Sequence, residues 1–163
     1  IQCAYVSSQF SLAVAGTRDG FLFLISLTTG TSDGAVDLKG ARPYKVLVTP
    51  SWGFILVYMT ELNRGVVRRA LALYSPNGNL IKRTTIAHSI SAWSCFKTKD
   101  GFDYIVCADD RGRIWLFETF LLMLDESIYR CNGQVSAVMY SLEHGGVIAT
   151  TTDGRILFVP SPL

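Results

Sequence analysis

The stretch AGTRDGFLFLISLTTGT, residues 15–31, holds a polar turn, an apolar run and a second turn, and variants of it recur along the chain. Asp19 and Gly20 stand in the first turn, directly ahead of the apolar run. The stretches DDRGRIWLFE, residues 109–118, and TDGRILFVP, residues 152–160, repeat the same order of turn and strand. Such self-similarity predicts an architecture built from repeats.

The turn glycines set the length of the repeat. Gly112 and Gly154 lie one period of roughly 40–45 residues apart, and Gly20 precedes Gly112 by about two such periods. Gly65, again in a polar turn before an apolar run, fills the gap. The sequence therefore predicts four units with the same turn between their second and third strands.

Each unit supplies runs rich in Val, Ile, Leu, Phe and Tyr, separated by turn residues, which indicates short β-strands. The expected strands are 3–8, 12–17, 21–27 and 34–40; 44–50, 53–60, 69–75 and 79–85; 91–97, 103–109, 113–119 and a weaker 126–131; and 136–142, 146–152 and 155–161. For the segment 117–127 we favour a loop and a short strand over a helix.

The turn residues are expected to have structural roles. Asp side chains can hydrogen-bond a turn backbone, and Gly adopts the positive φ that such turns need. We assign these roles to Asp19, Gly20, Asp110, Gly112, Asp153 and Gly154. A further hairpin is predicted at SPNGNL, residues 75–80, where Asn77 and Gly78 tolerate positive φ.

Four-stranded antiparallel units of this length predict an all-β fold, a WD-repeat-like β-propeller of four blades. The blades are expected at 1–40, 41–87, 88–132 and 133–163, within one partial propeller spanning 1–163. The last unit lacks a fourth strand, so we interpret the chain as the C-terminal part of a larger ring. Unpaired edges predict poor behaviour as an isolated monomer, or self-association of two copies. A β-sandwich is the less favoured alternative.

Composition bounds the class of protein. The 163 residues are 49% hydrophobic and 17% charged, which is typical of one folded domain. The net charge of +2 comes from interspersed charges, so no nucleic-acid partner is expected. No apolar run reaches the ~18 residues of a membrane helix. We expect a cytoplasmic protein that is peripheral to membranes only through other parts of a longer chain.

Catalytic and metal-binding patterns are not evident. The four cysteines, at 3, 95, 107 and 131, form no C-x-x-C pair and no ligand pair with His88 or His144, which favours free buried thiols in a reducing compartment over a zinc site or a disulfide framework. No motif for a nucleophile, a zinc hydrolase or a phosphate loop is present. We therefore expect neither enzyme activity nor a cofactor or metal.

Binding to proteins is the favoured function, through loops at one end of the blades. The candidate partner-binding residues are Arg18, Arg42, His88 and Arg111, because Arg is favoured at interfaces. Trp52 and Trp93 are expected in the core. The alternatives are a propeller enzyme or sugar binder, which needs polar groups on the first strand of each blade, and a scaffold of an unrelated WD-repeat complex.

The segment TRDGFLFLISLTTGT, residues 17–31, resembles the WD repeat, in which Asp-Gly, a strand ending in Trp-Asp and a Thr-Gly hairpin follow one another. Ile25-Ser26, Phe117-Glu118 and Val159-Pro160 occupy the Trp-Asp place. The Gly-His dipeptide that opens a typical repeat is absent, and only His88 stands near its place. The family's network of Asp, His, Ser and Trp is therefore expected to be incomplete.

Four longer segments are similar to the C-terminal propeller of BEACH-domain proteins of the neurobeachin and Chediak–Higashi type. They are SSQFSLAVAGTRDGFLFLISLTTG, ALALYSPNGNLIKR, FDYIVCADDRGRIWLFE and VSAVMYSLEHGGVIATTTDGRILFV, and together they span most of the chain. This resemblance implies a non-catalytic scaffold that acts in vesicle trafficking and membrane dynamics.

Overall fold

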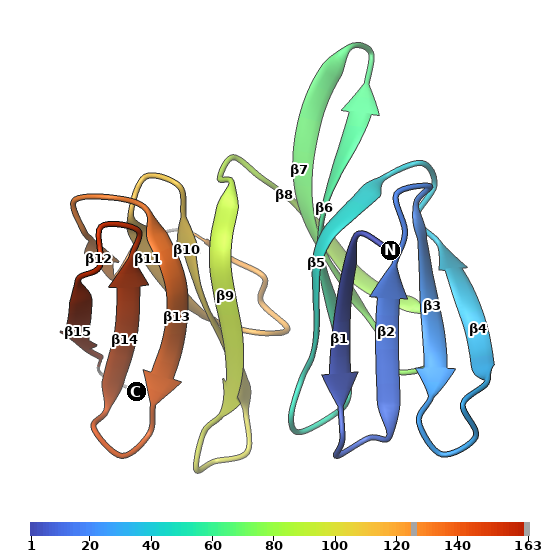
Figure 1. Cartoon of the computed structure of the whole chain (residues 1–163), viewed down its shortest axis with the longest axis horizontal. Helices are drawn as coiled ribbons and strands as arrows, with labels where there is room; N and C mark the ends of the chain where they lie inside the picture. The colour runs from blue at the N-terminus through green and yellow to red at the C-terminus, as the bar shows by residue number, and fades with distance from the viewer. Residues whose placement is uncertain (125–126, 162–163) are drawn as a thin grey trace. The chain divides into compact units, whose positions relative to one another are not determined.

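The computed structural model describes residues 1–124 and 127–161, which form antiparallel β-strands joined by turns. The chain divides into two compact units, Ile1–Ala87 and His88–Leu163. Each unit contains two of the four sheets (Figure 1). No residue in the described ranges lies in a helix, so none forms a helix able to cross a membrane.

The first unit holds two four-stranded sheets in which sequential strands are neighbours. The first sheet consists of β1 (Cys3–Ser7), β2 (Leu12–Gly16), β3 (Phe21–Ser26) and β4 (Ser32–Asp37). The second consists of β5 (Arg42–Val48), β6 (Ile55–Asn63), β7 (Val66–Tyr74) and β8 (Leu80–Ile86).

The second unit repeats this arrangement less completely. Its first sheet has β9 (Ile90–Lys97), β10 (Asp103–Asp109), β11 (Arg113–Glu118) and the short β12 (Tyr129–Arg130). Its second has three strands, β13 (Val135–Ser141), β14 (Gly146–Thr151) and β15 (Ile156–Pro160). The structure thus confirms an all-β chain of repeated antiparallel sheets. The weak strand predicted at 126–131 is reduced to two residues.

The segment 117–127 contains no helix in its described part, and residues 125–126 lie outside the described ranges. Thr119 is the first residue after β11, and its hydroxyl donates to the Asp103 carbonyl oxygen at 2.9 Å. Leu122 is buried and has a φ of +49°. The loop predicted here is therefore what the described residues show.

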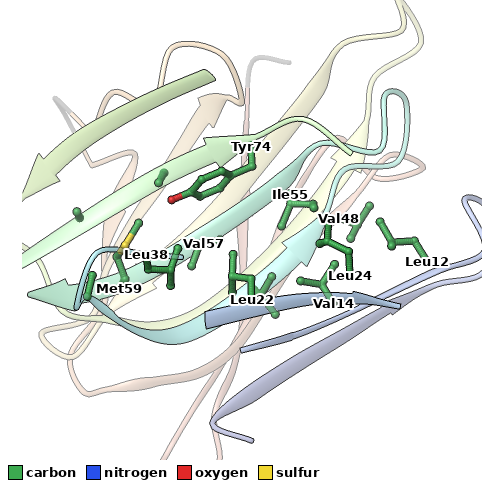
Figure 2. Close-up of a cluster of buried hydrophobic side chains, with 14 residues drawn as sticks. Leu12, Val14, Leu22, Leu24, Leu38, Val48, Ile55, Val57, Met59 and Tyr74 are labelled. Carbon is green, nitrogen blue, oxygen red and sulfur yellow. The ribbon is translucent and has the colours of Figure 1, made fainter. Parts of the chain in front are cut away.

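A continuous apolar core joins the two sheets of the first unit (Figure 2). Alternate residues of β2 and β3, such as Val14, Leu22 and Leu24, point to this side because successive strand residues face opposite sides. They pack on residues of the second sheet, among them Ile55 and Val57, which are fully buried. Burial of these side chains supplies the main stabilisation of the unit.

The second unit has an equivalent core between β9–β11 and β13–β15. Val106, Ala108 and Ile114 contribute from one sheet, and Val147 and Ala149 from the other. An aromatic stack also crosses between the sheets, because the Phe96 and Tyr140 rings lie parallel with their centroids 4.1 Å apart.

The hairpin of β6 and β7 extends beyond the neighbouring strands of its sheet (Figure 1). Its turn residues Arg64 and Gly65 have φ values of +49° and +77°, as a tight two-residue hairpin requires. Leu62, at 73% exposure, projects near the tip. Trp52, in the turn before β6, is 59% exposed, so the expectation that it belongs to the core is wrong.

Candidate functional site

Asp109 is the central residue of a polar cluster at the end of β10. Its side chain is fully buried. Its Oδ1 accepts the backbone N–H of Arg111 at 3.0 Å and that of Arg113 at 2.8 Å. Its Oδ2 accepts from Arg113 Nε at 2.9 Å and lies 2.7 Å from Arg113 Nη2. The buried carboxylate is therefore paired and hydrogen-bonded, as burial of a charge requires.

His88 completes this cluster from the segment before β9. Its Nδ1 lies 2.9 Å from Arg113 Nη2 and 3.9 Å from Asp109 Oδ2. Because the guanidinium only donates, Nδ1 accepts, which requires an unprotonated nitrogen. Burial lowers the pKa of His88, and the positive charge of Arg113 lowers it further. The cluster therefore favours the neutral imidazole.

Trp115 forms the apolar wall of the cluster. Its ring centroid lies 4.5 Å from that of His88, and the Arg113 guanidinium carbon lies 5.2 Å from the ring. The Arg113 guanidinium gains cation–π attraction from this ring. The His88 ring is tilted by 31° to it and makes an aromatic contact. Arg113 thus links Asp109, His88 and Trp115, and this arrangement stabilises the β10–β11 turn.

The same cluster offers no ready catalytic chemistry. Asp109 and Arg113 satisfy each other, and a neutral His88 accepts from Arg113 on the nitrogen nearest the carboxylate. Among the residues that the structure describes, no group of three or more His, Cys, Asp and Glu is placed to hold a metal ion. The cluster is best understood as a structural support for the loop that presents Arg111.

The four residues predicted to bind partners occupy loops and strand starts. In the second unit, His88 is largely buried with its side chain 20% exposed, and Arg111 is exposed beside it in the β10–β11 turn. In the first unit, Arg18 lies exposed in the β2–β3 turn and Arg42 is the exposed first residue of β5. Of the four, His88 is better described as support than as contact surface.

Three of the four turns between second and third strands use a capping residue that the sequence analysis missed, whereas the β6–β7 turn has Leu62 at the equivalent position, so it is not the same turn that we predicted for all four units. The side chain that bonds the turn stands three positions before the glycine, at Thr17, Asp109 and Thr151. Thr17 Oγ1 accepts the Phe21 N–H at 3.3 Å, and Thr151 Oγ1 accepts the Arg155 N–H at 3.3 Å. The Asp153 carboxylate accepts from the Thr151 hydroxyl and pairs with Arg155.

The glycines of these turns behave as predicted. Gly20, Gly78, Gly112 and Gly154 have φ values of +88°, +82°, +78° and +85°. In the hairpin at 75–80 only Gly78 has a positive φ. Asn77, at which we expected a positive φ to be tolerated, does not have one. The capping group there is Ser75, whose Oγ accepts the Asn79 N–H at 3.1 Å.

A groove with an aromatic floor lies at the other end of the second unit's sheets, at the β9–β10 and β13–β14 turns. Its volume is about 460 Å³, and it is lined by Thr98, Lys99, Asp100, Phe102, Tyr104, Tyr140 and Leu142. Phe102 and Leu142 remain 55% and 51% exposed at its walls. Phe96 supports the floor, since its ring stacks on Tyr140 and lies 6.0 Å from that of Tyr104.

Both turns that form the groove are held by side-chain hydrogen bonds. Thr98 Oγ1 accepts the Phe102 N–H at 3.2 Å, and Gly101 has a φ of +90°. Ser141 Oγ lies 3.0 Å from His144 Nδ1 and accepts the His144 N–H. The apolar walls are therefore preorganised, which lowers the entropic cost of binding. Aromatic residues beside a polar turn, as at Lys99–Phe102, are the signal that sequence analysis passed over.

Comparison with known proteins identifies the fold and no family. No protein-family profile matches the chain. The solved structure of the computationally designed Ika4 protein is similar, with a TM-score of 0.69 and 13% identity over 96% of this chain and 88% of that chain. BBS1N, solved in complex with ARL6DN, has a TM-score of 0.69 and 18% identity over 98% of this chain and 51% of its own.

The designed Ika8 protein is also similar, with a TM-score of 0.64 and 13% identity over 97% of this chain and 45% of that chain. The chain thus spans about half the length of BBS1N and of Ika8. These likenesses support a propeller-like, all-β fold of repeated sheets.

Proposed function

We propose that the chain is part of a WD-repeat-like β-propeller that acts as a non-catalytic scaffold for protein partners. The observation that carries this proposal is the preorganised groove of the second unit, with Phe102 and Leu142 exposed on its walls. Exposed aromatic and aliphatic side chains beside a concave surface are typical of binding sites. BBS1N, which shares the fold, was solved in complex with ARL6DN, which supports a binding role at the level of fold.

The chemistry of the groove defines the kind of partner. Its floor of Tyr104 and Tyr140 accepts an apolar side chain, while Lys99 and Asp100 offer charges of both signs at the turn. An extended protein segment with an apolar anchor flanked by polar residues fits this combination. The resemblance to BEACH-type propellers supports a finer proposal, that such partners belong to vesicle trafficking in the cytoplasm.

The test is capture of proteins from cell lysate on the immobilised chain, quantified by mass spectrometry against matched variants. The groove variant is Phe102→Ser with Leu142→Ser, and the control is Leu62→Ser on the β6–β7 hairpin, which alters an even more exposed side chain. We expect a defined set of proteins to be retained by wild type and control and reduced about tenfold or more by the groove variant. Circular dichroism verifies that all variants remain folded.

A second variant, Arg18→Glu with Arg42→Glu and Arg111→Glu, tests the partner-binding residues predicted from sequence. Loss of the same proteins in this variant, with the groove variant unaffected, would move the binding surface to the segments that carry these arginines. Equal capture by every variant would contradict a specific scaffold surface. If wild type binds a soluble oligosaccharide and the groove variant does not, the proposed scaffold function would be replaced by that of a small-ligand binder.

A further inference from the structure

The β6–β7 hairpin continues as a two-stranded ribbon beyond the rest of its sheet (Figure 1). Its pairing with β5 ends at Thr60, and its pairing with β8 ends at Arg69. The residues between these two, 61–68, therefore form the end of the hairpin without a third strand beside them. We call this segment the ribbon tip. At about 3.3 Å per residue, it extends roughly 10 Å past the neighbouring strands of its own sheet.

The ribbon tip carries apolar side chains that nothing in its unit covers. Leu62, Val66 and Val67 are 73%, 60% and 59% exposed. Leu62 and Val67 are direct cross-strand neighbours on one face of the ribbon, and Val66, opposite Asn63, lies on the other face. An isolated two-stranded ribbon is marginally stable in water, and apolar residues on both of its faces gain no burial there. This distribution suits insertion into an apolar medium better than packing on one flat surface.

Arginine side chains stand beside these apolar residues. Arg64 lies in the turn and Arg68 follows Val67, and both are exposed. The ribbon tip has one acidic residue, Glu61, which pairs with Arg83 of β8. Among the residues that the structure describes, neither Arg64 nor Arg68 forms an ion pair. The ribbon tip therefore presents positive charge that the rest of its unit does not neutralise.

A membrane surface that contains anionic lipids matches both properties of the ribbon tip. Peripheral elements bury their apolar side chains about 5–10 Å into the boundary between headgroups and acyl chains, and the ribbon tip projects far enough to reach that depth. Arginine stems can lie along apolar surface while the guanidinium groups bind lipid phosphates. A pocket in a protein would have to bury Arg64 together with Val66, which requires a matched anion inside the pocket. A lipid surface supplies phosphates around the whole ribbon.

We propose that the ribbon tip docks on the surface of a membrane that contains anionic lipids. Leu62, Val66 and Val67 insert between the headgroups, and Arg64 and Arg68 bind lipid phosphates. This site belongs to the first unit, whereas the groove proposed to bind proteins belongs to the second. It adds a contact within this chain to the membrane association that we expected only through other parts of a longer chain.

The test is flotation of the purified chain with vesicles made of two parts phosphatidylcholine and one part phosphatidylserine. Bound protein rises with the vesicles, whereas aggregated protein does not. We expect wild type to float with these vesicles and to stay behind when the vesicles are pure phosphatidylcholine. Raising the salt concentration should release the bound chain, because screening weakens the attraction between arginine and lipid phosphate.

Two variants separate the apolar contribution from the charged one. The apolar variant is Leu62→Ser with Val66→Ser and Val67→Ser, and the charge variant is Arg64→Gln with Arg68→Gln. Each is expected to weaken binding to the anionic vesicles about tenfold or more. All five side chains are exposed, so neither variant is expected to disturb folding, which circular dichroism verifies.

The matched control is Leu80→Ser with Ile81→Ser, because these side chains are 55% and 44% exposed at the opposite end of the same sheet. The control is expected to bind vesicles as wild type does. Absence of wild-type flotation, equal flotation with both lipid compositions, or equal loss in the control would each overturn the proposal. Capture of proteins from lysate that is lost with the apolar variant, without vesicle binding, would overturn it in favour of a protein partner.

Discussion

Asp109 is expected to contribute more to stability than the neighbouring carboxylate of Asp110. Its side chain is fully buried and accepts hydrogen bonds from two backbone N–H groups and from the Arg113 guanidinium. Asp109→Ala removes the acceptor of all these donors and leaves Arg113 unpaired. We expect the free energy of unfolding to fall by about 2–4 kcal/mol. Chemical denaturation followed by tryptophan fluorescence measures this change.

Asp110→Ala provides the control for that measurement. Asp110 is adjacent and exposed, so its removal is expected to change the unfolding free energy by less than about 0.5 kcal/mol. Equal effects of the two substitutions would contradict the assignment of the turn cap to Asp109.

At the scale of single residues, sequence analysis found the turn glycines but not their capping partners. The Asp next to the glycine is the conspicuous residue, and we expected Asp19, Asp110 and Asp153 to bond the turn. The capping oxygen comes from Thr17, Asp109 and Thr151, because only a side chain at the start of the turn reaches the N–H beyond the glycine. A search for Ser, Thr or Asp three positions before Gly would have identified them.

At the scale of the element, equivalent turns differ in what surrounds them. Gly112 has a φ of +78°, and a Cβ there would lie 2.4 Å from the Cys131 carbonyl oxygen and 2.5 Å from that of Gly133. Gly154 has a similar φ of +85°, but a Cβ there would meet nothing within 4 Å. The turn at Gly112 is therefore packed against the segment that follows its sheet, and the turn at Gly154 is open.

This difference makes the two glycines a matched pair. Gly154→Ala costs only the strain of the left-handed conformation, about 1–2 kcal/mol. Gly112→Ala adds close contact with the carbonyl groups of Cys131 and Gly133, and displacing this segment would break the hydrogen bond from the Cys131 N–H to the Gly112 carbonyl oxygen, so we expect a loss above about 3 kcal/mol. Thermal unfolding of both variants measures the difference. Equal losses would show that the segment 131–133 moves away from the turn at little cost.

The arrangement of turns and strands was predictable from the sequence, since apolar runs and Gly turns are local signals. The groove was not, because its walls come from Phe102 and Leu142, on two hairpins of different sheets that only folding brings together. The cluster around Asp109 has the same origin, since His88 and Arg113 lie on separate segments. Local patterns predict the elements, and sites built across elements require the coordinates.

At the scale of the whole molecule, each unit has a core of its own, and a buried thiol on the other face of β10, opposite Val106 and Ala108, reports on the folding of the second unit. Cys107 is 1% exposed on β10, a strand paired on both sides, and burial raises the pKa of its thiol. Both effects suppress alkylation, because the thiolate is the reactive form. Cys3, on the short first strand, is only partly buried.

We expect Cys107 to be alkylated only when the second unit unfolds, and Cys3 to react sooner through local opening of β1. The reporters for that unfolding are Trp93 and Trp115, which pair directly with Cys107 across the strands, whereas Trp52 is already 59% exposed. Peptide-resolved labelling in increasing urea should therefore give Cys107 the same denaturant dependence as tryptophan fluorescence. Labelling of Cys107 at the rate of Cys3, without dependence on urea, would mean that β10 opens by local motion and that its sheet does not unfold together with the rest of the second unit.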